Sequence, residues 1–248
     1  IPAQVKVKKH VRHVYSCRQC ERHGLETPIQ TAPMPNPVFP KSIASPSSLA
    51  YILNQKYVEG LPLYRQEKQL NRMGVPLKRQ TISNWIIEGA KPWLEPMFDR
   101  LHHHLIQQEA LHADETTLQV LQEPGKSASS NSYMWMYRSG REGVPIVLYD
   151  YKRTRAGKHP VKFLQDFTGY LHVDGYQGYN NIPRVTLVGC WAHARRKFDE
   201  ALKALPDSMS SSNTLAKQGL DYCNQLFQME KKTNEFSSKE RLDYRHKH

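Results

Sequence analysis

Hydrophobic residues recur at helical spacing between residues 49 and 108. The first expected helix starts near residue 49, and its apolar stripe consists of Leu49, Ile52, Leu53 and Tyr57. A second helix is predicted over 63–73, where Gly74 ends it, and a third over 79–87. A fourth is predicted over 94–108. The pattern therefore predicts a helical region of about sixty residues.

The second and third of these helices, joined by a short glycine-containing turn, form the pattern of a helix-turn-helix motif. The inward-facing residues of the third helix are expected to be Ile82, Trp85 and Ile86. Its outer face carries Lys78, Arg79, Gln80, Ser83 and Asn84. Such side chains can contact phosphates and base edges, so this segment predicts DNA binding. The alternative is a plain helical hairpin with a solvated polar face.

From residue 109 the hydrophobic period changes from helical spacing to two, which is typical of strands. Strands are predicted over 111–121, 133–138, 144–151, 170–174 and 185–191, and helices over 159–167, 192–205 and 214–230. The order βββαβαβα predicts a mixed α/β sheet with helical crossovers. In this order the first and fourth strands lie side by side at the centre of the sheet.

The charge balance changes the picture, because 35 lysines and arginines against 23 acids give a formal net charge of +12. A polyanion is the natural partner for such a chain, and nucleic acid is the first candidate. The alternative is a merely soluble basic protein. No apolar run approaches the ~18 residues of a membrane helix, and no secretory signal is visible. These features predict a cytoplasmic protein that does not bind membranes.

The N-terminal part contains the close cysteine pair Cys17 and Cys20, separated by two residues. This gap allows both sulfurs to reach one tetrahedral zinc ion, although a structural site needs four ligands. The pair is either half of a zinc knuckle or two ordinary thiols. Six prolines between residues 28 and 48 then predict a linker. Helices are expected to begin after it, with either Ser45-Pro46 or Ser47 as the cap and first turn.

These shifts in composition divide the chain into five parts. They are a partial zinc-knuckle-like basic segment (1–27), a proline-rich linker (28–48), a helical DNA-binding domain (49–108), a sheet-containing catalytic core (109–205) and the start of a helical insertion or tail (206–248).

Two aspartates are the strongest candidates for chemistry. Asp114 lies within the first strand, and Asp174 ends the fourth, so adjacent strands bring them together. Two carboxylates are suitable ligands for magnesium or manganese, and two such ions can promote displacement at a phosphodiester. The alternatives are a strand-edge acid at Asp114 and a turn residue at Asp174, where glycine follows.

The fifth strand leads into a helix that carries further polar candidates. His193, Lys197 and Glu200 fall on one helical face, with Arg196 adjacent. Because this strand-to-helix turn is expected near the acids, its basic groups could bind the scissile phosphate. The alternative is an ordinary amphipathic helix with solvated charges.

Together, several stretches resemble bacterial transposases of the DDE superfamily, specifically the insertion-sequence-66 family. The matching stretches, between about residues 45 and 198, are PLYRQEKQLNRMGVPLKRQTISNW, LHADETTLQVL, YMWMY, LHVDGYQGYN and GCWAHARRKF. The resemblance implies an RNase H-like core in which Asp114 and Asp174 are the first two acids of a catalytic triad. It implies a supporting role for Cys190 and His193. It also implies an N-terminal zinc module whose second half contains Cys17 and Cys20.

The chain departs from the family pattern in two places. The first cysteine pair of the zinc module is absent, and no segment matches the one that carries the family's third acid, a glutamate. Glu200 and Glu230 are the candidates for the third acid within this chain, and Glu200 is the better placed of the two. The other expectation is that the glutamate lies beyond His248, so that the chain is truncated at both ends.

The predicted function is that of a transposase that binds the terminal inverted repeats of its element and a target DNA. Two magnesium or manganese ions would serve strand cleavage and strand transfer. We expect copies to associate on DNA near the bacterial nucleoid, with accessory proteins as further partners. The alternatives are a catalytically incomplete DNA-binding remnant and a metal-dependent nuclease on the same fold.

Overall fold

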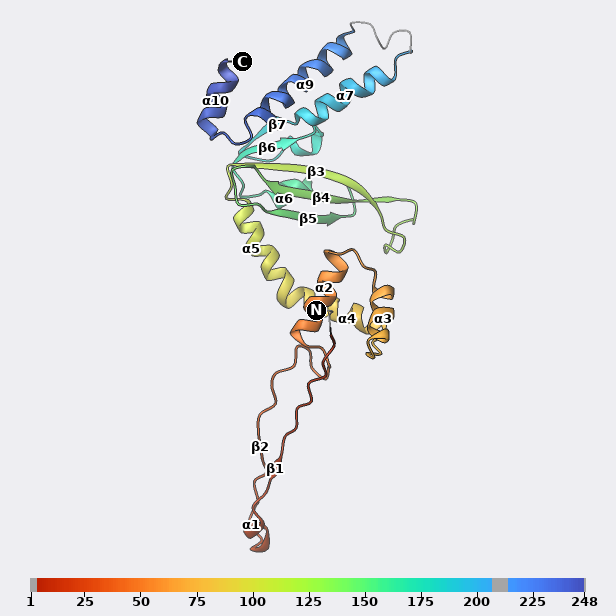
Figure 1. Cartoon of the computed structure of the whole chain (residues 1–248), viewed down its shortest axis with the longest axis vertical. Coiled ribbons are helices and arrows are strands. Elements are labelled where there is room, and N and C mark those ends of the chain that lie inside the picture. Colours follow the sequence, from red (N-terminus) through yellow and green to blue (C-terminus); the bar gives the residue numbers. More distant parts are fainter. Residues whose placement is uncertain (1–3, 207–213, 248) are drawn as a thin grey trace. The chain divides into compact units, whose positions relative to one another are not determined.

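The computed structural model describes residues 4–206 and 214–247, and it divides into two units between Met97 and Phe98. The first unit contains the arm elements β1 (Val14–Tyr15), α1 (Arg18–Arg22) and β2 (Gln30–Thr31), followed by α2 (Pro46–Tyr57), α3 (Leu63–Arg72), α4 (Arg79–Gly89) and η1 (Ala90–Leu94) (Figure 1). Helix α5 (Glu95–Leu105) spans the boundary.

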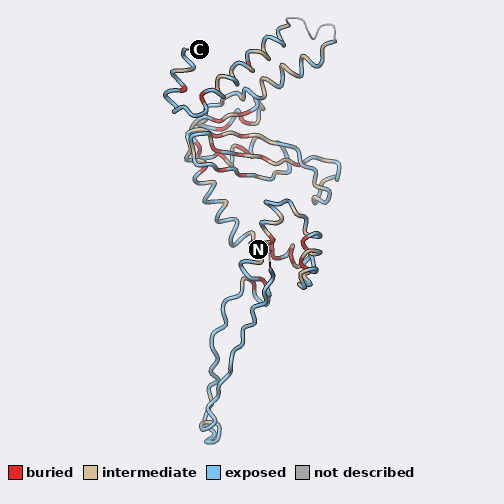
Figure 2. Tube along the Cα trace, in the orientation of Figure 1, coloured by how far each residue is buried: buried red, intermediate tan, exposed pale blue. Residues whose placement is uncertain are grey.

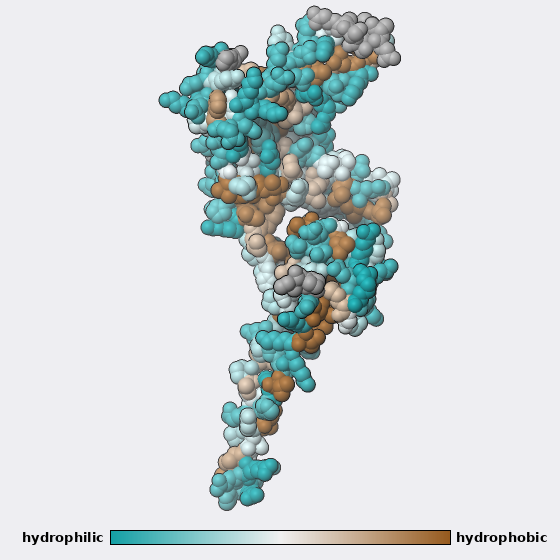
Figure 3. Space-filling view, in the orientation of Figure 1, coloured by the Kyte–Doolittle hydropathy of each residue, from teal (hydrophilic) through white to brown (hydrophobic). Residues whose placement is uncertain are grey.

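The arm of the first unit is a two-stranded ribbon in which Val14 pairs with Thr31 and Tyr15 with Gln30. Almost all of its residues are exposed (Figure 2). Apolar groups are scattered among its hydrophilic ones (Figure 3), and Val7 is 91% exposed. The arm therefore contributes no core of its own.

Helices α2, α3 and α4 pack around a small core. Its buried members are Phe39, Ala44, Leu49, Ile52, Leu70, Ile82, Trp85 and Ile86. The inward face predicted for the third helix is thus confirmed. Tyr57, which was expected in the apolar stripe of the first helix, is 63% exposed, because it lies at the end of α2 beyond the packed part. Phe39 and Ala44 show that the end of the proline-rich stretch joins this core.

Local capping explains where α2 begins. The Ser45 hydroxyl accepts a hydrogen bond from the Ser48 amide, and the Ser48 hydroxyl accepts one from the Ser45 amide. Pro46 occupies the first turn, where its missing N–H leaves no hydrogen bond unmade. The predicted cap is therefore confirmed.

The second unit is built on a five-stranded mixed sheet with the strand order β5-β4-β3-β6-β7 (Figure 1). The strands are β3 (Ala110–Gln119), β4 (Asn131–Ser139), β5 (Val147–Lys152), β6 (Gly169–Val173) and β7 (Val185–Gly189). The first three pair antiparallel, whereas β6 is parallel to both β3 and β7. The predicted mixed α/β sheet, with its first and fourth strands adjacent, is confirmed.

Helices and turns complete the second unit. They are α6 (Lys158–Phe163), η2 (Gln177–Tyr179), α7 (Trp191–Lys203), α9 (Leu215–Lys232) and α10 (Ser238–Lys247). Helices α7 and α9 pack against each other, so closely at Gly219 that a Cβ atom there would lie 2.4 Å from the Phe198 ring. Among the described helices, none is both long and apolar enough to cross a membrane.

Helix α10 lies in a stretch whose charged sequence gave no helical prediction. A capping box starts it, because the Glu240 carboxylate accepts a hydrogen bond from the Ser237 amide and the Ser237 hydroxyl accepts one from the Glu240 amide. Arg241 pairs with Glu142, and Arg245 pairs with Glu230 at 2.7 Å. Long-range ion pairs thus attach a helix that has almost no apolar face.

The main core lies on one face of the sheet. Its buried members on the strands include Leu111, Ala113, Trp135, Tyr137, Leu148 and Leu171, and Leu164 and Phe167 pack against them from the α6 region. Because side chains alternate along a strand, His112, Asp114 and Thr116 point to the opposite face. The fold therefore separates an apolar face from a polar one at β3.

Leu171 and Tyr170 allow this division to be tested within one strand. Leu171 is fully buried, whereas Tyr170 is 56% exposed. We expect Leu171→Ala to lower the free energy of unfolding by about 2–5 kcal/mol, because it leaves a cavity in the core. Tyr170→Ala should change it by less than about 1 kcal/mol. Urea unfolding followed by circular dichroism measures both, and equal effects would contradict the assigned faces.

Candidate active site

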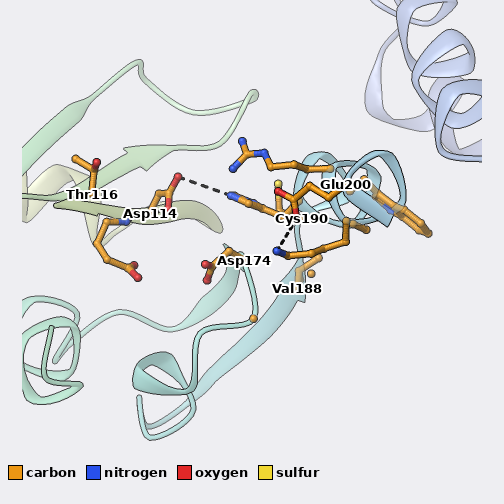
Figure 4. A pocket seen from close by; sticks show the side chains of 14 residues that line it. Asp114, Thr116, Asp174, Val188, Cys190 and Glu200 are labelled. Carbon is orange, nitrogen blue, oxygen red and sulfur yellow. Dashed lines mark hydrogen bonds and ion pairs between the residues drawn. The ribbon is translucent and has the colours of Figure 1, made fainter. Parts of the chain in front are cut away.

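The two candidate aspartates lie on neighbouring parallel strands. Leu111 pairs with Leu171 and His112 with His172, so both chains run in the same direction toward the two acids. Asp114 lies within β3, and Asp174 directly follows the last residue of β6. Both side chains line one open cavity of about 860 Å³. Figure 4 shows the two carboxylates on the same side of the sheet. The structure therefore brings together the pair that the sequence singled out.

Helix α7 forms the opposite wall of this cavity. The predicted site residues that line it from this side are Cys190, His193, Arg196, Lys197 and Glu200. They come close to the acids because α7 begins directly after β7, which is parallel to β6. Figure 4 shows Cys190 and Glu200 across the cavity from Asp114.

Each aspartate has one oxygen fixed by a neighbouring amide. Asp114 Oδ1 accepts a hydrogen bond from the Glu115 amide at 2.9 Å, and Asp174 Oδ1 accepts one from the Tyr176 amide at 2.8 Å. The second oxygen of each faces a basic group at 4.0 Å, which is His193 Nε2 for Asp114 and Arg155 Nη2 for Asp174. Each carboxylate is thus oriented by one hydrogen bond, and neither forms a short ion pair with the basic group that it faces.

The basic residues of the cavity differ in how they are held. His193 Nδ1 is buried and has no hydrogen-bond partner among the described residues, while Nε2 faces Asp114. Lys197 pairs with Glu200 at 2.9 Å, and both side chains are more than half exposed. Arg196 is exposed. Arg196 and Lys197 therefore present mobile positive charge at the mouth of the cavity.

A pair of histidines lies next to the acids on the same face of the sheet. The rings of His112 and His172 stack with centroids 4.6 Å apart. Burial, together with the positive charge of Arg138, lowers the pKa of His112 to about 4 and lowers the pKa of His172 as well. At neutral pH His112 is uncharged, so it does not compensate the charge of the acids.

Four residues that the sequence did not single out lie beneath the acids: Glu115, Arg155, Tyr176 and Tyr179. The Glu115 side chain is only 1% exposed and is bound by Arg155. Tyr179 donates its hydroxyl hydrogen to Glu115, and burial together with this bond raises the pKa of Tyr179. Glu115 could have been found from the sequence, because alternation along β3 places this acid at a core-facing position.

The acid pair suits a divalent cation of the magnesium type. Such ions are held by one or two carboxylates together with substrate phosphates and water. Asp114 and Asp174 provide hard oxygen ligands, and the second oxygen of each lies 4.0 Å from the nearest basic group named above. Among residues 4–206 and 214–247, no group of three histidines, cysteines or acids could hold a metal ion without further ligands. The donor set therefore fits a cation whose remaining coordination positions are filled by water or by a substrate.

The cysteine pair lies at the start of α1. Cys17 is exposed and Cys20 half-buried, and hydrogen bonds from Cys20 lower the pKa of the Cys17 thiol. A lower pKa favours the thiolate, which is the metal-binding form. No third ligand joins them in the part of the chain that the structure describes. Zinc binding stays a prediction.

In the helical unit, the residues predicted to contact DNA surround the start of α4. Lys78, Arg79, Gln80 and Asn84 are exposed, and Ser83 is half-buried. The Glu67 carboxylate of α3 accepts a hydrogen bond from the Arg79 amide, which anchors the first turn of α4. Gln80 donates to Asn84 at 3.0 Å. The structure thus presents this polar surface on a firmly packed helix.

Comparison with known proteins gives curated relatives from Sinorhizobium fredii. The uncharacterized protein y4jD is 29% identical over an aligned length of 261 residues, and the alignment covers 99% of this chain and 48% of that protein. The uncharacterized protein y4qI is 35% identical over 165 residues, which cover 60% of this chain and 30% of that protein. The chain spans about half the length of the first of these relatives.

A solved structure, the cryo-EM structure of a simian T-cell lymphotropic virus intasome in complex with PP2A regulatory subunit B56 gamma, is similar over 46% of this chain and 47% of that one. The TM-score is 0.25 with 8% sequence identity, which is too low to support a conclusion. The family described as Transposase IS66 family matches residues 41–248, which include both candidate aspartates. This chain therefore belongs to the IS66 family of transposases.

Proposed function

We propose that this chain is part of a transposase that binds the ends of its element and supplies two acids for cutting and joining DNA. The observation that carries the proposal is that Asp114 and Asp174, from neighbouring parallel strands, line one cavity with the basic residues of α7. Terminal inverted repeats, a target DNA, accessory proteins and association of copies on DNA are part of the same proposal.

In this proposal Asp114 and Asp174 hold divalent magnesium or manganese. When bound, such ions stabilise the attacking and leaving oxygens of a phosphodiester displacement. The chain itself binds the scissile phosphate through Arg196 and Lys197, which line the cavity on the wall facing the acids. Charged groups of this kind neutralise phosphate and set the register of DNA.

His193 has a defined place beside the acids. Its Nε2 lies 4.0 Å from Asp114 Oδ2, and its ring is half-buried against the cavity. At this position it orients the second oxygen of Asp114 and can hold a proton there.

Attack by water and then by a 3′-hydroxyl would give strand cleavage followed by strand transfer. Cleavage without joining would instead describe a nuclease.

DNA recognition is proposed for the surface around the start of α4. Lys78 and Arg79 contact phosphates, while Gln80, Ser83 and Asn84 face base edges. The support is the exposure of four of these residues on a helix whose inner face is buried. A recognition helix needs this combination of a fixed inner face and a free polar outer face.

The first test of the catalytic proposal replaces each aspartate in a full-length protein that contains this chain. Asp114→Asn and Asp174→Asn should each reduce manganese-dependent cleavage of element-end DNA to background, because a neutral amide is a poor ligand for a hard cation. DNA binding should be unchanged. Asp221→Asn, which removes an exposed acid of α9, is the control. Retained cleavage in either aspartate variant would remove the metal-ligand assignment.

Glu200 can be tested as the third acid in the same assay. Its carboxylate is paired with Lys197 at 2.9 Å and half exposed. Because the family resemblance places the third acid outside this chain, we expect Glu200→Gln to retain cleavage within about threefold of the unaltered protein. Loss of cleavage, to the level of Asp114→Asn, would instead make Glu200 the third acid.

The DNA-binding proposal predicts a change in salt dependence. Each phosphate contact adds about 0.9 to the slope of log K against log salt concentration. The double variant Lys78→Ala/Arg79→Ala should therefore reduce the magnitude of that slope by about 2, which makes the salt dependence shallower. Lys231→Ala/Lys232→Ala, an exposed lysine pair at the end of α9, is the matched control. Fluorescence anisotropy with labelled element-end DNA measures both, and equal slopes would count against the assignment.

A further inference from the structure

An ion pair with a buried carboxylate lies on the core side of β3, next to the acid pair. Glu115 follows Asp114 along the strand, so their side chains point to opposite faces. Arg155, from the loop between β5 and α6, places its Nε 2.7 Å from Glu115 Oε1. The Glu115 side chain is 1% exposed, and a buried carboxylate needs such a partner. This contact ties the loop to the strand that carries Asp114.

The same arginine also contacts the turn that carries Asp174. Its guanidinium carbon lies 3.8 Å from the centre of the Tyr176 ring, and the Tyr176 hydroxyl donates to the Arg155 carbonyl oxygen at 2.5 Å. The Tyr176 amide in turn donates to Asp174 Oδ1. Arg155 Nη2 lies 4.0 Å from the other oxygen of Asp174. One side chain thus contacts segments beneath both acids.

Backbone packing independently holds these segments together. A Cβ atom on Gly157 would lie 2.8 Å from the carbonyl oxygen of Gly178, so the loop and the turn after β6 meet backbone to backbone. The Tyr179 hydroxyl donates to Glu115 Oε2 at 2.5 Å and closes the ring of contacts. The strand, the loop and the turn therefore form one rigid cluster below the cavity.

We propose that Arg155 is a positioning residue for the acid pair. By holding Glu115 on β3 and Tyr176 after β6, it fixes how Asp114 and Asp174 are presented to a divalent cation. The inference rests on the proposed function, in which these aspartates bind the cation. Arg155 is not among the residues that line the cavity, so it acts through the acids and not on the substrate.

Positioning and charge predict opposite effects of removing Arg155. A positive charge near Asp174 repels a cation, so its loss alone would tighten cation binding. Residues that orient metal ligands typically contribute 10–100-fold to metal affinity, so the loss of positioning would weaken binding. The Arg155 side chain is 42% exposed, so solvent screens its charge. We therefore expect the positioning effect to dominate.

The test is Mn²⁺ titration of the 248-residue chain by calorimetry. The double variant Glu115→Gln/Arg155→Gln removes both charges at once, so no buried charge loses its partner. Its affinity for Mn²⁺ should be lower than that of the unaltered chain by about tenfold or more. Thermal unfolding by circular dichroism reports whether the variant is folded.

The matched control uses a second ion pair of the same unit. Arg153 Nε lies 2.9 Å from Glu123 Oε1, and the Glu123 side chain is only 7% exposed. Neither residue lines the cavity. The variant Glu123→Gln/Arg153→Gln should bind Mn²⁺ with the affinity of the unaltered chain. An equal loss in both double variants would show a general structural effect and overturn the inference.

Unchanged or tighter Mn²⁺ binding by a folded Glu115→Gln/Arg155→Gln variant would also overturn it. Because Glu115 itself lines the cavity, Arg155→Lys is measured alongside the double variant, and it carries the test if that variant does not fold. Lysine keeps the charge but cannot contact Glu115 and the Asp174 turn together. Arg155→Lys should weaken Mn²⁺ binding several-fold, and unchanged affinity would overturn the inference. Failure of the proposed function looks different: the unaltered chain would not bind Mn²⁺, or Asp114→Asn would bind it equally well.

Discussion

Parallel pairing of β3 with β6 is the constraint on which the candidate active site depends. Hydrogen bonding between the two strands fixes their register, and a shift by one residue would turn one aspartate to the apolar face. The pairing requires the chain to cross over between β5 and β6, and that crossover contains Arg155 and α6. The same connection that makes the strands parallel therefore also carries the arginine beneath the acids.

Charge compensation explains the arrangement around the acids. Two carboxylates on adjacent strands repel each other unless positive groups are nearby. Arg155 lies 4.0 Å from Asp174 Oδ2, which is close enough for attraction and too far for a tight ion pair, and His193 Nε2 lies at the same distance from Asp114 Oδ2. Glu115, in contrast, is buried and fully paired. Glu115 is therefore held by an ion pair, whereas the two aspartates, proposed as metal ligands, form no short ion pair with the groups that they face.

The helical unit has its own core and its own chemistry. Its inner face is apolar and buried, while the start of α4 is polar and fixed to α3 by Glu67. This separation of a packed face from a polar one is what a nucleic-acid-binding helix requires. This chain belongs to the IS66 family and has a net charge of +12, and the surface around α4 is the one for which DNA recognition is proposed above.

The sequence by itself determined the order of strands and helices from β3 to α9, the inward face of α4 and the pairing of Asp114 with Asp174. These follow from local periodicity and from the rule that parallel strands need a crossover. Only the tertiary structure decided that Glu115 is paired with Arg155, forty positions away, and that α10 forms through ion pairs with distant acids. Such contacts join residues whose local sequence gives no periodic signal. Their partners are therefore known only once the strands have been placed in the sheet.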